Sequence, residues 1–208
     1  MITPYYQDEW ATIYHGDCRG ILPMLDLVDL VLTDPPYGLG DKMQGGTWGV
    51  TRKQEMTWDK VAPTALVLSL LNKAPEIVIW GGNYFPLPPS RGWLSWFKPD
   101  APPTMANFEL AWTNQDRNAR QLSYSISATN AERIGHPTQK PLALMRWSLS
   151  FFPKTQIVLD PFMGSGTTLR AAKDLGIKSI GIEIEEKYCQ IAVERLRQES
   201  LLGVIERS

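Results

Sequence analysis

Residues 157–168 read Ile157-Val158-Leu159-Asp160-Pro161-Phe162-Met163-Gly164-Ser165-Gly166-Thr167-Thr168. An apolar run ends in an acid, and a turn with two glycines then leads into a helical pattern over 167–175. Gly164 and Gly166 let the backbone approach a ligand closely, and the first turn of the helix offers free N–H groups. This strand, turn and helix predict an α/β fold that binds its ligand at the carboxyl end of a strand.

A second acid supports a ligand at this turn. Glu183 lies near the end of the next apolar run, about twenty residues on, where a carboxylate can accept hydrogen bonds from both hydroxyls of a ribose. Asp160 before the turn and Glu183 after it favour a nucleoside, although a turn of this kind also serves NAD or packing alone. No lysine follows Gly166, which disfavours a phosphate-binding P-loop.

Apolar runs alternate with helical patterns along the rest of the chain, as in parallel βα units. The strands we expect are 11–15, 29–33, 76–80, 93–97, 109–112, 156–160 and 178–184. The helices we expect are 62–73, 167–175 and 185–202. Two stretches, 38–61 and 114–135, lack periodicity and exceed the usual length of a connection, so we expect them to be long loops.

Composition predicts a single domain over 1–208, because 208 residues with 43% hydrophobic content suffice for one core. Cys18 and Cys189 are far apart and lack metal-ligand spacing, which predicts neither a disulfide nor a metal site. No basic leader opens the chain and no apolar run approaches the roughly 20 residues that span a bilayer, so we expect a cytoplasmic protein without membrane contact. A net charge of −1 restricts any contact with nucleic acid to local patches.

The acceptor segment Asp34-Pro35-Pro36-Tyr37 follows another apolar run, 27–33. Its prolines fix two φ angles and remove two N–H donors, which leaves acceptors exposed at the end of a strand. The Asp34 carboxylate and the Pro35 carbonyl could accept both N–H groups of an aromatic amine, and Tyr37 could stack on its ring. A proline-stiffened turn with a capping Asp explains the same residues without chemistry.

The order of these motifs resembles the β group of amino-methylating DNA methyltransferases, in which the acceptor motif precedes the cofactor motif as a circular permutation. The matching segments are Gly16-Asp17-Cys18, Asp34–Tyr37, His136-Pro137-Thr138-Gln139-Lys140-Pro141, Asp160–Thr168 and Glu183. They occur in the family's order over almost the whole chain.

The resemblance implies a Rossmann-like methyltransferase fold, with a mostly parallel seven-stranded sheet that includes one antiparallel strand. It implies S-adenosylmethionine (SAM) as methyl donor, and double-stranded DNA with a flipped-out target base as substrate. A homodimer and a restriction–modification setting are further expectations. The catalytic residues implied are Asp34, Pro35, Pro36 and Tyr37. The cofactor residues implied are Asp17, Cys18, Asp34, His136, Thr138, Lys140, Asp160, Phe162, Gly164, Ser165, Gly166, Thr167, Thr168 and Glu183.

The two long loops hold the candidate DNA contacts. They are Lys42, Trp48, Arg52, Lys53, Arg117, Arg120 and Arg133. Each cation could equally be a solvated loop charge, and Trp48 could instead pack the loop down. The family usually carries a target-recognition domain where this chain has 114–135, which we expect to be only a loop. We therefore expect a short or relaxed recognition site.

Asp at the first position of the acceptor segment resembles the adenine-N6 enzymes more than the cytosine-N4 enzymes, which often carry Ser there. Adenine is thus the expected base. The alternatives are N4-cytosine methylation, methylation of RNA or of a protein glutamine, and a non-catalytic module on the same fold that binds cofactor or DNA.

Overall fold

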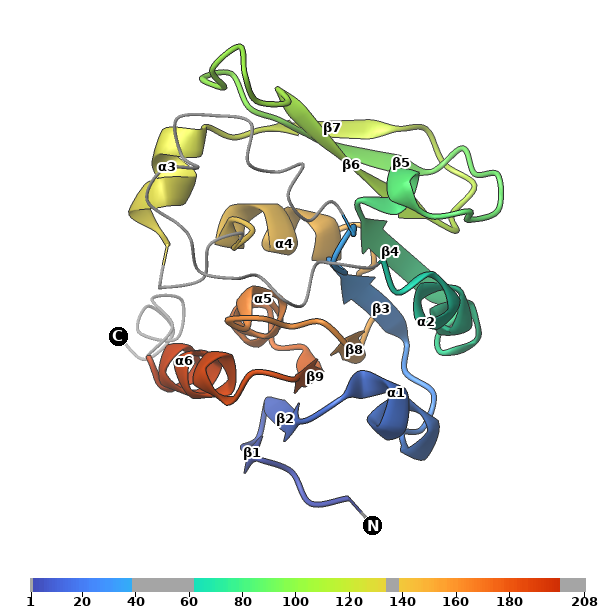
Figure 1. Cartoon of the computed structure of the whole chain (residues 1–208), viewed down its shortest axis with the longest axis vertical. Helices are drawn as coiled ribbons and strands as arrows, with labels where there is room; N and C mark the ends of the chain where they lie inside the picture. Colours follow the sequence, from blue (N-terminus) through green and yellow to red (C-terminus); the bar gives the residue numbers. More distant parts are fainter. Residues whose placement is uncertain (1, 39–61, 134–138, 199–208) are drawn as a thin grey trace.

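A computed structural model describes residues 2–38, 62–133 and 139–198. Within them, nine strands form one sheet (Figure 1). In spatial order they are β1 (Tyr6–Gln7), β2 (Ala11–His15), β9 (Lys178–Glu183), β8 (Ile157–Asp160), β3 (Leu30–Thr33), β4 (Glu76–Trp80), β6 (Phe108–Thr113), β5 (Trp93–Phe97) and β7 (Arg120–Ser123).

The sheet is mostly parallel. Strands β2, β9, β8, β3 and β4 run in one direction, and β6 is antiparallel to both of its neighbours. The α/β fold class is therefore confirmed, and the seven strands expected from the sequence are all present within one residue at each end. The expected number of strands is wrong, because β1 and β7 extend the two edges and β1 is a second antiparallel strand.

Six α-helices lie in the described ranges. They are α1 (Cys18–Ile21), α2 (Thr64–Ser69), α3 (Ile126–Ala131), α4 (Leu142–Leu149), α5 (Thr167–Asp174) and α6 (Glu186–Arg197). The expected helices 62–73, 167–175 and 185–202 are found as α2 with a 3-10 turn over Leu70–Asn72, α5 and α6. None of the six is long and apolar enough to cross a membrane.

The segment 114–135 is not the single loop that the sequence predicted, because it contains both β7 and α3. Side-chain caps explain why a helix forms in this polar stretch. Ser125 Oγ accepts a hydrogen bond from Ala128 N at 3.1 Å. The carboxylate of Asp100 accepts from the N–H groups of Ile126 and Ser127 at 2.6 and 2.9 Å. These bonds satisfy donors that every helix start leaves free.

Helices cover both faces of the sheet, with α4, α5 and α6 on one side and α1 and α2 on the other (Figure 1). Successive residues of a strand point to opposite faces, so β3 contributes to both cores. Leu32 packs in a cluster with Leu144 of α4 and Ala171 of α5. Val31 packs on the other side with Val67 of α2.

The sheet has its topological switch point between β3 and β8. The chain leaves β3 towards β4 on one side, and leaves β8 towards β9 on the other. Open α/β sheets bind their ligands at the carboxyl ends of strands where the connections diverge in this way. The acceptor segment follows β3 and the glycine turn, residues 160–168, follows β8, so both motifs emerge at this point.

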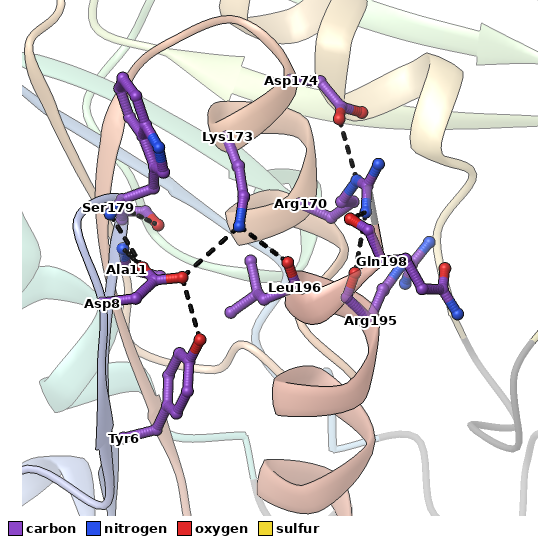
Figure 2. Close-up of polar contacts among 11 residues, drawn as sticks. Tyr6, Asp8, Ala11, Arg170, Lys173, Asp174, Ser179, Arg195, Leu196 and Gln198 are labelled. Carbon is purple, nitrogen blue, oxygen red and sulfur yellow. Dashed lines mark hydrogen bonds and ion pairs between the residues drawn. The ribbon is translucent and has the colours of Figure 1, made fainter. Parts of the chain in front are cut away.

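Polar side chains of α5 fasten this helix to α6 and to the N-terminal strands (Figure 2). Arg170 donates to the carbonyl oxygens of Arg195 and Gln198 at 2.9 and 2.8 Å. Lys173 donates to the carbonyl of Leu196 at 2.8 Å and pairs with Asp8 at 3.5 Å. These cations satisfy carbonyl groups at the C-terminal end of α6, where the helix dipole favours positive charge.

The Asp174 carboxylate at the end of α5 provides a test of this packing. Its side chain is fully buried and binds Arg170 Nε at 2.9 Å and the Arg146 guanidinium. We expect Asp174→Ala to lower the free energy of unfolding by about 3 kcal/mol, because it removes the shared partner of two guanidinium groups. Chemical denaturation measures the change. Asp116→Ala, which breaks an exposed pair with Arg91, serves as the control and should cost less than about 1 kcal/mol.

Candidate active site

The acceptor segment is held rigidly at the end of β3. Lys140 Nζ donates to Asp34 Oδ2 at 2.6 Å, and the Tyr37 hydroxyl donates to Oδ1. The Tyr37 ring stacks on Tyr84 with centroids 4.8 Å apart and lies against Gly81. Gly81 has a φ of +69°, and a Cβ there would lie 2.0 Å from the Tyr37 ring. Only glycine fits at this position.

A buried group of charges surrounds the Asp34 carboxylate. The ammonium of Lys140 lies 2.6 Å from Asp34 and 3.1 Å from Glu109 Oε2. Lys98 pairs with the other Glu109 oxygen. The resemblance implies that Lys140 binds the cofactor, whereas the ammonium of Lys140 binds the acceptor carboxylate. Glu109 and Lys98 are not among the residues predicted from the sequence. An acid within the apolar strand β6 was a usable signal, because buried charges need partners.

These neighbours shift the acidities of the cluster. Burial raises the pKa of Asp34, an effect that Lys140 opposes and Glu109 reinforces. Burial also raises the pKa of Tyr37, further increased by Asp34, so the phenol remains protonated. Burial alone would raise the pKa of Glu109, but the ammonium groups of Lys140 and Lys98 lower it to about 2. Glu109 is therefore a fixed negative charge.

The glycine turn forms a tight cradle at the end of β8. Gly164 and Gly166 have φ angles of +51° and +75°, in the left-handed region that favours glycine. Gly164 N donates to Glu183 Oε2 at 3.0 Å, and Ser165 Oγ contacts Gln139 Oε1 at 3.3 Å. The turn thus connects the end of β9 to the segment that precedes α4.

The Asp160 carboxylate organises the base of this turn. It accepts hydrogen bonds from Thr33 Oγ1 at 2.7 Å, from Phe162 N at 3.1 Å and from the Thr168 hydroxyl. Burial raises the pKa of Asp160 to about 6. Thr167 Oγ1 accepts from the buried guanidinium of Arg195 at 2.8 Å, a residue that the sequence analysis missed.

Asp17 and Cys18 lie at the same edge of the sheet as Glu183. His15 pairs with Glu183 in the sheet, and Gly16 N donates to the Glu183 carbonyl at 2.8 Å. Asp17 caps α1 by accepting from Arg19 N at 2.9 Å. The Cys18 thiol is buried, and burial raises its pKa to about 11, which makes it a packing group rather than a nucleophile.

The candidate DNA contacts lie in different parts of the molecule, and only some of them are among the described residues. Lys42, Trp48, Arg52 and Lys53, and the cofactor candidates His136 and Thr138, lie outside the described residues. Arg133 follows α3 at the carboxyl edge of the parallel strands. Arg117 and Arg120 lie after β6 and at the start of β7, which is the opposite edge. A DNA contact by Arg117 at the site is not supported, because its guanidinium donates to the Phe151 carbonyl at 3.3 Å and covers the Phe152 ring.

The comparisons with known proteins agree with this geometry. Residues 94–194 match a DNA methylase family whose members act on N6 or N4 amino groups. The chain is 28% identical to the type II methyltransferase M.ScaI of Streptomyces caespitosus, over 95% of this chain and 84% of the relative. It is 26% identical to the type II methyltransferase M2.LlaDCHI of Lactococcus lactis subsp. cremoris, over 98% and 96%. These similarities support a DNA methyltransferase of this kind.

Solved structures show that the methyltransferase has the expected fold. The complex of M1.HpyAVI with SAM matches with a TM-score of 0.62 at 24% identity, over 89% of this chain and 100% of that one. The cytosine-N4-specific PvuII DNA methyltransferase matches with a TM-score of 0.64 at 17% identity, over 95% and 90%. Since both amino targets occur among these proteins, the comparisons leave the base open.

M1.HpyAVI was crystallised with SAM, and the residues at the carboxyl edge of this sheet have the chemistry to hold that cofactor. The Glu183 carboxylate is held by Gly164 N at 3.0 Å and by Glu185 N at 2.8 Å, and a carboxylate at such a strand end is the kind of group that binds ribose hydroxyls. Gly164 and Gly166, both in the left-handed region, leave the backbone of the turn accessible beside this carboxylate. When bound, SAM supplies a methyl carbon on a positively charged sulfur.

Glu183→Ala tests the cofactor end of the site. We expect the affinity for SAM to fall by about 1.5–3 kcal/mol, because hydrogen bonds to a charged group are lost. Isothermal titration calorimetry gives the dissociation constant. Glu185→Ala, at the half-exposed neighbouring acid, is the control. An unchanged constant in Glu183→Ala would refute the nucleoside role of this strand end.

Proposed function

We propose that this methyltransferase moves the methyl group of SAM to the exocyclic N6 of adenine in DNA, as the modification enzyme of a restriction–modification system. The observation that carries the proposal is the Asp34 carboxylate at the end of β3, beside the glycine turn at the end of the adjacent β8. Acceptor and donor sites therefore lie next to each other.

The acceptor segment suits a weakly nucleophilic amine. The lone pair of an aromatic amino group is delocalised into the ring, so the nitrogen must be positioned and polarised. In the proposed complex, the Asp34 carboxylate and the Pro35 carbonyl accept its two N–H groups and direct its lone pair at the methyl carbon. The new N–C bond forms as the C–S bond breaks, and the nitrogen releases one proton.

The aromatic surface beside Asp34 suits a planar base. Tyr37 and Tyr84 are stacked, and Tyr84 is 47% exposed. The N6 group of adenine is paired inside a duplex, so the base has to leave the stack before the amine can reach Asp34. We infer that the extruded base stacks on this tyrosine pair. The identity of the base as adenine rests on Asp at position 34, where the cytosine-N4 enzymes often carry Ser.

The variant Asp34→Ala tests whether Asp34 acts on the target amine rather than on the cofactor. We expect methyl transfer to fall by about 10²–10³-fold or more, as for removing a group that stabilises a transition state. The affinity for SAM should stay nearly unchanged, because Asp34 faces the amine. Radiolabelled transfer and calorimetry measure the two quantities. Full turnover in this variant would exclude the proposed role.

The substrate is tested by offering DNA, RNA and protein side by side and analysing the nucleosides formed. We expect N6-methyladenine in DNA. N4-methylcytosine would keep the fold and the cofactor but correct the base. Incorporation only into RNA or protein would overturn the proposal, and the Asp34→Ala protein controls for background methylation.

DNA binding should depend on the carboxyl edge of the sheet. We expect Arg133→Ala to weaken binding to duplex DNA and to reduce the slope of log K against log salt by about one, as for the loss of one phosphate contact. Arg117→Ala, at the opposite edge, is the matched control and should leave the slope unchanged. Fluorescence anisotropy at several salt concentrations decides between them.

A further inference from the structure

We propose that Glu109 and Lys98 are positioning residues for methyl transfer, which provide the Lys140 ammonium with a second partner and so leave Asp34 able to accept the target amine. This inference rests on the proposed role of Asp34. It concerns two residues that lie on β6 and directly after β5, outside the motifs of the acceptor segment and the glycine turn.

Lys140 lies between two carboxylates. Its Nζ is 2.6 Å from Asp34 Oδ2, 3.1 Å from Glu109 Oε2 and 3.2 Å from the Tyr37 hydroxyl. An ammonium has three donors, so Lys140 can serve both carboxylates at once, with a hydrogen bond to Asp34 and an ion pair to Glu109. Without Glu109, the whole charge of Lys140 would be directed at Asp34.

Glu109 is held in place from its other side. Lys98 binds its second oxygen, and the Lys98 ammonium lies 4.6 Å from the centre of the Trp96 ring. The side chains of Lys98 and Lys140 are only 7% and 8% exposed. Charges excluded from water in this way interact strongly and move little. Lys98 therefore fixes the position of Glu109 rather than attracting substrate.

The four charges balance, with two carboxylates and two ammonium groups. Loss of a neighbouring negative charge should lower the pKa of Asp34, and loss of a neighbouring positive charge should raise it. The groups that face Asp34 are Lys140 and Tyr37, which bind it, together with Glu109 and Asp160, with which it interacts through space. Asp34 must be ionised to accept the amine. Its protonation therefore causes the methylation rate to fall at low pH, and this fall is the acidic limb of the rate profile.

The experiment measures single-turnover methylation of DNA against pH, using the full chain with saturating SAM. We expect Glu109→Gln to slow transfer about tenfold near neutral pH, as for weakening one charge-assisted hydrogen bond, and to move the acidic limb to lower pH. Lys98→Met should move the limb to higher pH. The double variant should return it towards that of the wild type.

Controls separate positioning from folding. Glu109→Asp keeps the charge and should hold the limb near its wild-type position even if transfer slows. Glu76→Gln, at the amino end of β4, should change neither quantity. Because Asp160 has a pKa of about 6, SAM affinity is measured over the same pH range to identify its titration.

The proposal is overturned if Glu109→Gln and Lys98→Met move the limb in the same direction, or if neither moves it while both proteins stay folded by circular dichroism. If Glu109→Gln does not fold, the double variant and Lys98→Met give the same comparison of sign. Whether the target base is adenine is tested by a different measurement, the identity of the methylated nucleoside that the wild-type enzyme forms.

Discussion

The hydrogen bond from Thr33 Oγ1 to Asp160 joins the ends of β3 and β8 inside the protein, where both side chains are buried. Thr33 immediately precedes the acceptor segment and Asp160 is the first residue of the glycine turn, so this contact sets the spacing between the two segments. The Asp160 carboxylate also receives Phe162 N and Thr168 and thereby shapes the turn that follows. A sheet that brought these ends together less accurately would separate the nucleophile from the methyl group, and small errors of placement cost large factors in rate.

Around this contact the protein concentrates charge that a purely structural core would avoid. Burying ions is costly unless each has a partner, and replacing such groups by apolar residues often stabilises a protein. Here Asp34, Glu109, Lys98 and Lys140 compensate one another at the edge where chemistry is expected. A second buried charge cluster, around Asp174, joins two helices instead. Compensated buried charges therefore surround the acceptor carboxylate at the candidate active site, whereas around Asp174 they hold helices together.

The sequence predicts the central sheet well, because buried strands such as β4 and β8 are short apolar runs. The edge strand β7 was missed, since Arg-Gln-Leu-Ser is mostly exposed and its pairing depends on β5. Helix α4 was missed because apolar residues lie around much of its circumference and leave weak periodicity. The acceptor segment and the glycine turn were recognisable as local motifs, whereas the contact of Lys140 with Asp34 spans 106 positions and required the fold. Glu109 needed the same information.

The permuted order of the segments has a consequence for how the chain is made. Strand β3 can pair with β4 as soon as residue 80 has been synthesised, but its other edge waits for β8, which begins at 157. Strand β2 waits longer, since its parallel partner β9 begins at 178. During translation the emerging protein therefore exposes apolar strand edges for most of its synthesis, and such edges invite pairing with other chains. The central pairing of β3 with β8 closes only after residue 160 has been synthesised, so the acceptor segment and the glycine turn come together late in folding.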